Sequence, residues 1–265
     1  MPVIDLPKPL LESFPQITPE LDDRGLLALG GDLSPERLLA AYHRGVFPWF
    51  GEHDPILWWS PNPRMIIRPG SVHVSRRLLR QLRKQPPRIS TDTAFETVMQ
   101  ACAAPRAADS GGTWITDDML EAYCRLNSLG FAHSVEVWLD EELVGGIYGV
   151  SLGRAFFGES MFTQRDQGSK IALIALCALL ERQGVGLLDC QMHTGHLQRM
   201  GGQTLPRPVF LREVAGLTRQ RPAEEWCPVD EAISWPALEQ FCRNVQQERR
   251  QNYAKMTAGK HRTGR

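Results

Sequence analysis

The sequence predicts an α+β protein: a small N-terminal domain, residues 1–62, followed by a larger domain with a mixed sheet, residues 63–235. Two observations favour this class. Between residues 133 and 193, three strand-like runs are followed by a turn, an apolar helix-like run and another strand-like run. Before residue 62 the chain is instead rich in proline, glycine and tryptophan. A meander that leads into a helix and a further strand is typical of α+β domains.

Composition excludes several classes of protein. The 265 residues carry 30 basic and 30 acidic side chains, so nucleic acid can be attracted only through local patches. The six cysteines form no CxxC pair, which favours reduced thiols. The N-terminus does not resemble a signal peptide, and the longest apolar run, residues 171–180, is too short to span a bilayer. We expect a cytoplasmic monomer with no metal, no cofactor and no membrane contact.

The first clear helix should begin after Ser34, a capping residue, with Pro35 at the first helical position. It should run through ERLLAAYHR and stop at Gly45, since glycine readily adopts the left-handed conformation that ends helices. The next run, VFPWFGEHDPILWWSPNPRMII, is typical of a loop and a strand. Asn62-Pro63 is the expected joint between the domains.

Four further segments precede the meander. Residues 75–84 predict a basic amphipathic helix that buries Leu78, Leu79 and Leu82. RIST then predicts a strand and residues 93–103 a helix. Thr116, with two aspartates after it, predicts the start of a helix that buries Met119, Tyr123 and Leu126 and ends before Gly130.

Residues 236–265 are polar and basic, so we expect a disordered tail.

The strands HSVEVWL, GGIYGVSL, AFFGESMF and GLLDCQMH contain polar residues where apolar ones are expected. Glu159, Asp189 and Gln191 are the notable ones, because burying a polar group without a partner costs several kcal/mol. Asp189 and Gln191 are two apart on the last strand, so their side chains should share one face, where the carboxylate orients the amide. Glu159 should face the same cleft. The alternative is a polar network with a purely structural role.

The order of these elements resembles the acetyltransferase-like (GNAT) core, in which the turn before the helix holds the diphosphate of acetyl-CoA. Here that turn reads Arg165-Asp-Gln-Gly-Ser-Lys170. Lys170 stands where a small residue lets a diphosphate approach the backbone, and Asp166 adds a negative charge. A CoA site is therefore disfavoured. His193 and His196 lack a third ligand nearby, which also disfavours a metal site.

Several long runs resemble the leucyl/phenylalanyl-tRNA–protein transferase family over about residues 20–212: GLLALGGDLSPERLLAAYHRGVFPWF, PILWWSPNPR, GTWIT, ELVGGIYGV, FFGESMF and LLDCQMHTGHLQRMGG. The resemblance implies a small N-terminal domain before a GNAT-like domain. It also implies transfer of leucine or phenylalanine from aminoacyl-tRNA to proteins that begin with Arg or Lys, in N-end rule protein degradation. Because a missing methylene changes binding by only about 1–3 kcal/mol, methionine should be accepted less well.

The resemblance also implies residue roles. Asp189 and Gln191 match the pair that takes part in peptide-bond formation, and Glu159 matches the acidic residue of the cleft. Trp49, Trp114 and Tyr123 match aromatics around the terminal adenosine. The pocket for the aminoacyl side chain should be lined by Ile147, Phe156, Met161, Leu173, Leu176 and Leu180, which serve equally well as plain core. The proposed contacts to the tRNA backbone are Arg76, Arg77, Arg80, Arg83 and Lys84, in a stretch of residues 76–88 without an acidic residue.

Three other functions fit parts of the sequence. They are an acetyl-CoA-dependent N-acyltransferase, an aminoacyl-tRNA-dependent ligase of cell-wall peptides with paired GNAT-like domains, and an RNA-binding module without catalysis. The turn at residues 165–170 argues against the N-acyltransferase. The cell-wall ligase is disfavoured because the chain has room for only one GNAT-like domain. Asp189 is expected to be the electrostatic partner of the attacking amine, and Gln191 the group that aims it. Glu159 is expected to attract the basic head of the acceptor.

Overall fold

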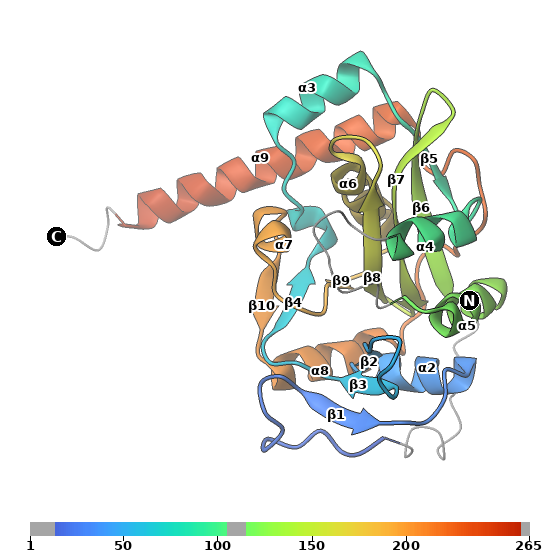
Figure 1. Ribbon diagram of the computed structural model, residues 1–265. Helices are drawn as coiled ribbons and strands as arrows, with labels where there is room; N and C mark the ends of the chain where they lie inside the picture. The colour runs from blue at the N-terminus through green and yellow to red at the C-terminus, as the bar shows by residue number, and fades with distance from the viewer. Residues whose placement is uncertain (1–13, 105–114, 261–265) are drawn as a thin grey trace.

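Two sheets organise the chain in the computed structural model, which describes residues 14–104 and 115–260, with side chains as far as residue 251 (Figure 1). The smaller sheet contains β1 (Leu26–Leu29), β3 (Leu57–Trp59) and β2 (Phe47–Pro48), in that spatial order. The larger contains, in spatial order, β10 (Gln203–Leu205), β4 (Arg64–Ile67), β9 (Leu187–Asp189), β8 (Ala155–Thr163), β7 (Glu142–Leu152), β6 (Ala132–Leu139) and β5 (Arg88–Thr91). Only the β8–β9 pairing of the larger sheet is parallel. The predicted α+β class with a mixed sheet is confirmed.

The helix α2 (Pro35–His43) follows β1 and packs beside the smaller sheet. Its start at Pro35 and the left-handed Gly45 after its end are as predicted. The side chain of Ser34, however, makes no capping hydrogen bond; its backbone N–H donates to Asp32 instead. The inner face of α2 is fully buried and carries Tyr42 toward the larger sheet. The smaller sheet and α2 therefore place one tyrosine at the boundary between the two sheets.

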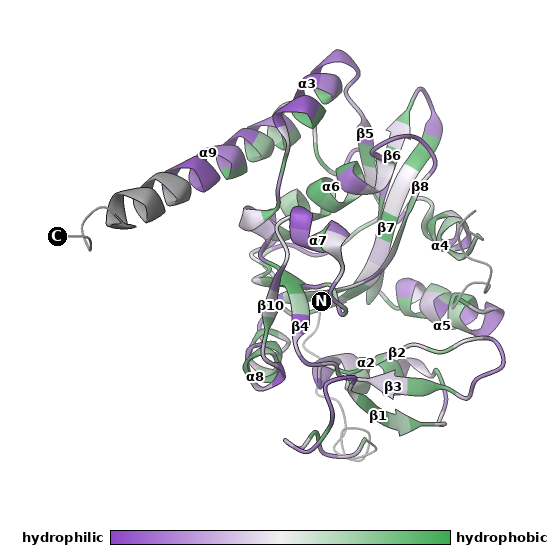
Figure 2. Ribbon diagram, turned by 60° about the vertical axis from the view of Figure 1, so that its left-hand side comes forward, coloured by the Kyte–Doolittle hydropathy of each residue, from purple (hydrophilic) through white to green (hydrophobic). Residues whose placement is uncertain are grey.

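The meander β6–β7–β8 matches the predicted runs and leads into α6 (Gly168–Arg182). Residues 171–180 of α6 are all buried, so the helix forms the centre of one hydrophobic core (Figure 2). Its first turn lies directly on β7, because a Cβ on Gly168 would overlap the carbonyl group of Val144. This close contact fixes how α6 starts beneath the sheet.

The remaining helices flank the two sheets, and α4 (Phe95–Ala103) packs on the face of β6, β7 and β8 that lies opposite α6. Ser75 caps α3 (Arg76–Lys84) by accepting a hydrogen bond from the Leu78 amide at 3.1 Å, and the three leucines of α3 are buried as predicted. Thr116 likewise caps the predicted helix after it, accepting from the Met119 amide at 3.3 Å. The other short helices are η1 (Pro69–Ser71), α4 (Phe95–Ala103), α5 (Asp117–Ser128), α7 (Gly195–Arg199) and α8 (Arg207–Leu217).

The last predicted strand is shorter than expected. It was predicted over residues 186–193, but β9 ends at Asp189. The backbone N–H of Cys190 still donates to Met65 of β4 at 2.9 Å, after which Gln191 adopts a left-handed conformation with φ of 60°. Asp189 and Gln191 therefore do not share one face of a strand. This change of backbone direction decides where the Gln191 side chain points.

The prediction of a disordered tail over residues 236–265 is wrong for its described part. The chain forms a long helix, α9 (Trp235–Lys260), whose first half lies beside α3 and whose second half extends away from the rest of the molecule (Figure 1). Leu238, Phe241, Cys242 and Val245 recur at helical spacing and are buried in the same core as α6. A sparse apolar stripe within a polar composition therefore holds this helix in place. No helix in the described residues is long and apolar enough to cross a bilayer.

Candidate active site

A buried ion pair links the strands β4 and β9. The Nε of Arg64 donates to Oδ1 of Asp189 at 2.8 Å, and its Nη2 donates to Oδ2 at 2.6 Å. Both side chains are fully buried. The guanidinium carbon lies 4.6 Å from the ring centroid of Phe47 and 4.6 Å from that of Phe210. Such a two-pronged pair, held between aromatic faces, fixes the orientation of the Asp189 carboxylate.

Asp189 in turn holds the backbone of Gln191. Its Oδ1 accepts a hydrogen bond from the Gln191 N–H at 2.9 Å. A positive φ is costly for residues other than glycine unless neighbouring interactions impose it. This bond, together with the 3.1 Å bond from the Met65 N–H to the Gln191 carbonyl, imposes it here. The carboxylate therefore orients Gln191 through the main chain, whereas the sequence predicted contact between the two side chains.

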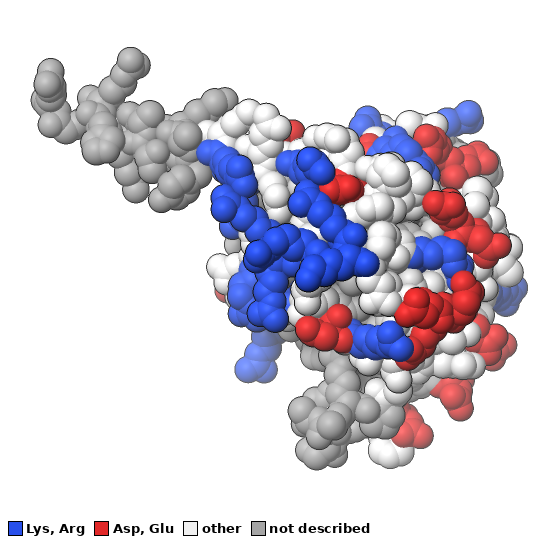
Figure 3. Space-filling model, turned by 90° about the horizontal axis from the view of Figure 1, so that it is seen from above, with Lys and Arg blue, Asp and Glu red and all other residues white. Residues whose placement is uncertain are grey.

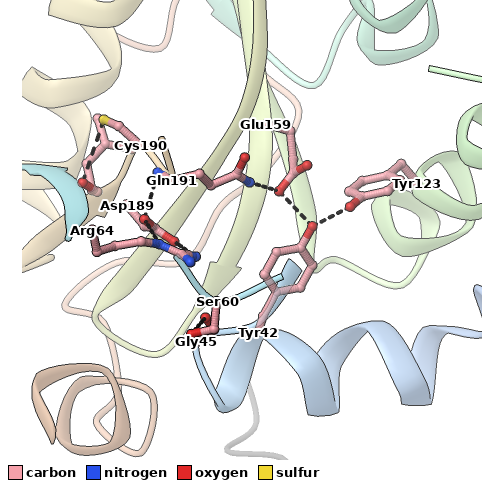
Figure 4. Close-up of polar contacts among 10 residues, drawn as sticks. Tyr42, Gly45, Ser60, Arg64, Tyr123, Glu159, Asp189, Cys190 and Gln191 are labelled. Atoms are coloured by element: carbon pink, nitrogen blue, oxygen red, sulfur yellow. Dashed lines mark hydrogen bonds and ion pairs between the residues drawn. The ribbon is translucent and has the colours of Figure 1, made fainter. Parts of the chain in front are cut away.

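The Gln191 amide meets Glu159 on β8. Its Nε2 donates to Oε1 of Glu159 at 2.8 Å, and the Tyr42 hydroxyl donates to the same oxygen at 2.7 Å (Figure 4). The Tyr123 hydroxyl is hydrogen-bonded to that of Tyr42. The second oxygen of Glu159, Oε2, is shielded from solvent and has no hydrogen-bond partner among the described residues. Glu159 is therefore anchored through one oxygen, while the hydrogen-bonding capacity of the other is unused among the described residues.

The pKa of Glu159 is raised from its ordinary value of 4.5 to about 8, chiefly by burial and in addition by the negative charge of Asp189. The hydrogen bond from Tyr42 and the charge of Arg64 oppose this rise. Although Glu159 as a residue is only half-buried, its carboxyl oxygens lie inside, so burial acts on the charged group. Burial also raises the pKa of Tyr42 and Tyr123 well above the usual range. At neutral pH the side chains of Glu159, Tyr42 and Tyr123 are therefore largely uncharged.

The raised pKa predicts how stability changes with pH. Between pH 4.5 and about 8 the unfolded chain releases the Glu159 proton while the folded protein keeps it. Glu159 therefore lowers the free energy of unfolding as pH rises through that window, by on the order of 1 kcal/mol per pH unit. We expect Glu159→Gln to remove this loss, so that the variant gains stability relative to wild type at pH 8 but not at pH 4.5. Urea unfolding of both proteins at the two pH values measures the difference; an equal difference at both contradicts the assignment.

The predicted aromatic site residues differ in how far their rings are exposed. The Trp49 side chain is 41% exposed and its ring meets that of Trp59 edge-on, with centroids 5.8 Å apart. Tyr123 is fully buried, so it presents its hydroxyl to Tyr42 and no face to a base. Trp114 lies outside the described residues. Trp49 alone of these aromatics is described with an accessible ring.

The six residues expected to line a pocket for the aminoacyl side chain share one core. Ile147, Phe156, Leu173, Leu176 and Leu180 are buried there, and Met161 is partly buried against it. The five expected tRNA contacts all lie on α3 and are exposed. Arg83 is paired with Glu239 of α9 at 2.7 Å. The structure thus brings the apolar set together beneath the sheet, and the basic set together on one helix.

Two residues of this cluster are absent from the sequence-based list. Tyr42 occupies a position of its helix that fits an ordinary buried side chain. The neighbouring sequence therefore does not predict which group its hydroxyl binds. Arg64 opens the otherwise apolar strand Arg64–Ile67, as Asp189 ends the apolar run before it. Because each of these two apolar strands contains one charged residue, and the two charges have opposite signs, the sequence could have suggested an ion pair between them. The pairing itself joins positions 125 residues apart and depends on the fold.

Comparison with known proteins identifies the family. A family model described as "Leucyl/phenylalanyl-tRNA protein transferase" matches residues 66–215, and the model of that family's N-terminal domain matches residues 31–62. The protein of that name from Nitrosomonas eutropha is 55% identical over 208 residues, which cover 78% of this chain and 88% of the relative. Those from Nitrosospira multiformis and Cellvibrio japonicus are 53% and 49% identical over 81% and 84% of this chain, and over 93% and 95% of the relatives. The family model covers more than half of the chain and these relatives cover more than three quarters of it, so the chain belongs to the leucyl/phenylalanyl-tRNA protein transferase family.

Proposed function

We propose that this enzyme transfers leucine or phenylalanine, and methionine less well, from aminoacyl-tRNA to the α-amino group of proteins that begin with Arg or Lys. The observation that carries the proposal is the Gln191–Glu159 hydrogen bond at 2.8 Å, in a cluster held by Arg64 and Asp189. The names of the relatives, leucyl/phenylalanyl-tRNA–protein transferases, support aminoacyl-tRNA as the donor. We place the reaction in the cytoplasm, where aminoacyl-tRNA is available, and in N-end rule protein degradation.

The reaction needs orientation more than a strong base. The amine nitrogen forms a bond to the ester carbonyl carbon, the bond from that carbon to the ribose oxygen breaks, and an amine proton ends on the departing oxygen. An α-amino group has a pKa of about 7.7–8.0, so about a tenth of it is neutral near pH 7. Correct positioning contributes up to about 7–11 kcal/mol to such reactions. A cluster that aims the amine therefore suffices.

Each residue of the cluster then has one task. Nε2 of Gln191 is occupied by Glu159, which leaves the amide oxygen of Gln191 to accept a hydrogen bond from the attacking amine. The carboxyl group of Glu159, whose Oε2 has no hydrogen-bond partner among the described residues, attracts the basic head of the acceptor, and the charge of that head favours ionisation of the carboxyl group. Asp189 is fully buried against Arg64, so we assign it the role of positioning Gln191 rather than of touching the amine.

On the donor side, we propose that the leucine or phenylalanine side chain enters the apolar layer between β7, β8 and α6, with Trp49 beside the terminal adenosine. The two strands contribute Ile147, Phe156 and Met161, and α6 contributes the leucines. Trp114 is the second expected aromatic, and Tyr123 acts through its hydroxyl on Tyr42. The exposed basic side chains of α3 contact the tRNA backbone. We propose that one protein molecule suffices for the reaction.

The N-acyltransferase alternative is weakened by the turn before α6. We propose that the larger sheet is GNAT-like, since β8 pairs with β9 in parallel after an antiparallel meander. The amides that hold a diphosphate in acetyl-CoA enzymes are engaged here, however. The Gly168 N–H donates to the Arg165 carbonyl at 2.9 Å, and the Ser169 N–H to the Thr163 hydroxyl at 2.9 Å. An aminoacyl ester of tRNA needs no such turn.

Acceptor selectivity tests the proposed function. Wild-type enzyme with labelled Leu-tRNA should modify peptides that begin with Arg or Lys and leave an Ala-initiated peptide nearly unmodified. Glu159→Gln keeps the shape and the Gln191 contact but cannot become anionic, so we expect the Arg-over-Ala preference in kcat/KM to fall by about tenfold or more. Tyr42→Phe is the matched control, since it removes one donor to Glu159 and no negative charge. An unchanged preference in the Gln variant would refute the role of Glu159.

A further inference from the structure

A groove between α9 and the chain that leads into α3 gathers positive charge from both sides. Its cavity has a volume of about 470 Å³ and is lined by Arg76 on one side and by Arg249 and Arg250 on the other. No acidic residue lines it; the rest of the lining consists of His73, Ser75, Gln246 and three valines, Val72, Val74 and Val245, of which each is at most 5% exposed. Figure 3 shows Lys and Arg side chains gathered on the face where α3 and α9 lie, with most acidic side chains to the right of them. We call this cavity and its rim the α3–α9 groove.

The outer wall of this groove is held rigidly. Leu238, Phe241, Cys242 and Val245 bury one stripe of α9 in the core. The Gln246 side chain donates to the Val74 carbonyl at 3.0 Å, which ties the helix to the segment before α3. The exposed arginines of α9 therefore have fixed neighbours across the groove. A mobile tail would offer the same charges without this arrangement.

The acidic residues of α9 do not neutralise the positive charge of the groove. Glu239 accepts hydrogen bonds from Arg83 at 2.7 Å and from Arg243 at 2.8 Å, so it is engaged at the other end of the helix pair. The charge of Glu248 acts on Glu181 of α6, whose pKa is raised first by burial and then by Glu248. Within the described residues, Arg76, Arg249 and Arg250 have no carboxylate within ion-pair distance. Like charges facing one another repel unless an anion lies between them.

We infer that α9 forms a second wall of the tRNA-binding surface, and that the α3–α9 groove holds a stretch of the phosphodiester backbone of the donor. This inference rests on the proposed function and extends it to a helix that lies beyond residue 215, where the family model ends. Arginine pairs well with phosphate, because its planar guanidinium group offers several donors. Backbone contact of this kind positions an RNA without reading its sequence.

The shape of the groove favours RNA over an anionic membrane. A helix that binds a membrane presents apolar side chains next to its basic ones. The apolar residues of α9 point into the core instead. A groove between two helices also suits a single strand of backbone better than a flat surface of headgroups. The exposed face thus offers charge without an apolar anchor.

The test compares two donors with three proteins. One donor is full-length Phe-tRNA; the other is Phe esterified to the 3′-terminal trinucleotide, which carries the reacting ester but lacks the rest of the tRNA backbone. The proteins are wild type, Arg249→Glu/Arg250→Glu, and the matched control Arg212→Glu/Arg219→Glu, whose exposed arginines lie on and just after α8, at the opposite end of the molecule (Figure 1). Binding of labelled tRNA is measured from 50 to 300 mM salt, alongside transfer to an Arg-initiated peptide.

We expect the α9 variant to bind tRNA about tenfold or more weakly at 150 mM salt, and to show a salt slope smaller by about two, one unit for each lost phosphate contact. Its KM for Phe-tRNA should rise in parallel, with transfer from the trinucleotide donor and every property of the control variant as in wild type. Wild-type tRNA affinity in the α9 variant would overturn the inference. So would equal losses with both donors, or a loss confined to binding of phosphatidylserine vesicles. If wild type transferred from neither donor, the proposed function would fail, while tRNA binding would still decide the role of α9.

Discussion

Asp189→Ala is expected to lose turnover by about 100-fold or more and to lower the free energy of unfolding by about 3–5 kcal/mol. The variant leaves the guanidinium of Arg64 buried between two aromatic rings without its carboxylate. It also removes the acceptor that holds the Gln191 N–H, so the Gln191 side chain is no longer aimed at Glu159. Urea unfolding and single-turnover transfer measure the two effects. Binding of donor tRNA should be unchanged, because Asp189 lies inside and the basic surface is elsewhere.

A double variant separates positioning from folding. Replacing both members of a buried ion pair by apolar residues of similar size restores stability in several proteins. We therefore expect Arg64→Met/Asp189→Leu to recover much of the lost stability while turnover stays low, since the Gln191 N–H still lacks its acceptor. Recovery of turnover together with stability would mean that the pair acts only through folding. Near-normal turnover in Asp189→Ala itself would likewise show that Asp189 contributes to folding and does not position Gln191 for the reaction.

Gln191→Ala is expected to slow transfer by about 10²–10³-fold, the effect typical of losing one oriented polar group at a reacting centre. The substitution removes the amide oxygen proposed to bind the amine and leaves the Arg64–Asp189 pair intact. Because that pair persists, stability should change little, and KM for aminoacyl-tRNA should stay near wild type. The measurement is kcat and both KM values with an Arg-initiated peptide.

The controls for this prediction use the same position. Gln191→Glu keeps the length but places a carboxyl group next to Glu159, so it should raise the pKa of both groups and also transfer slowly. Gln191→Asn keeps the amide one methylene shorter and should retain part of the activity. Normal kcat in Gln191→Ala would show that the amide does not take part in aiming the amine.

Local sequence patterns predicted much of the fold. The proline after Ser34, the cap at Thr116 and the strand-like runs of β6–β8 are each recognised over a few residues, and the structure confirms the elements that they start or form. The helix α9 escaped prediction because its four buried apolar residues are scattered in a polar segment, where composition outweighs a narrow stripe. Periodicity is decisive only when a face is broad.

The site was predictable only in part. Glu159, Asp189 and Gln191 could be singled out because each interrupts an apolar strand. Their contacts depend on tertiary structure: the left-handed Gln191 follows from bonds to Asp189 and Met65, and the carboxylate that orients it is itself held by Arg64. No spacing along the chain encodes that pairing. The sequence therefore singled out these three residues, and the fold shows how they contact one another and Arg64.

One measurement tests the central claim most directly: incubation of the wild-type protein with radiolabelled Leu-tRNA and a short peptide that begins with arginine, followed by mass analysis of the peptide. The account predicts that the peptide gains one leucine on its α-amino group, through an amide bond that resists mild alkali. It predicts the same product at least 100-fold more slowly with Gln191→Ala. A peptide that gains no leucine, or gains it equally fast with both proteins, would contradict the account.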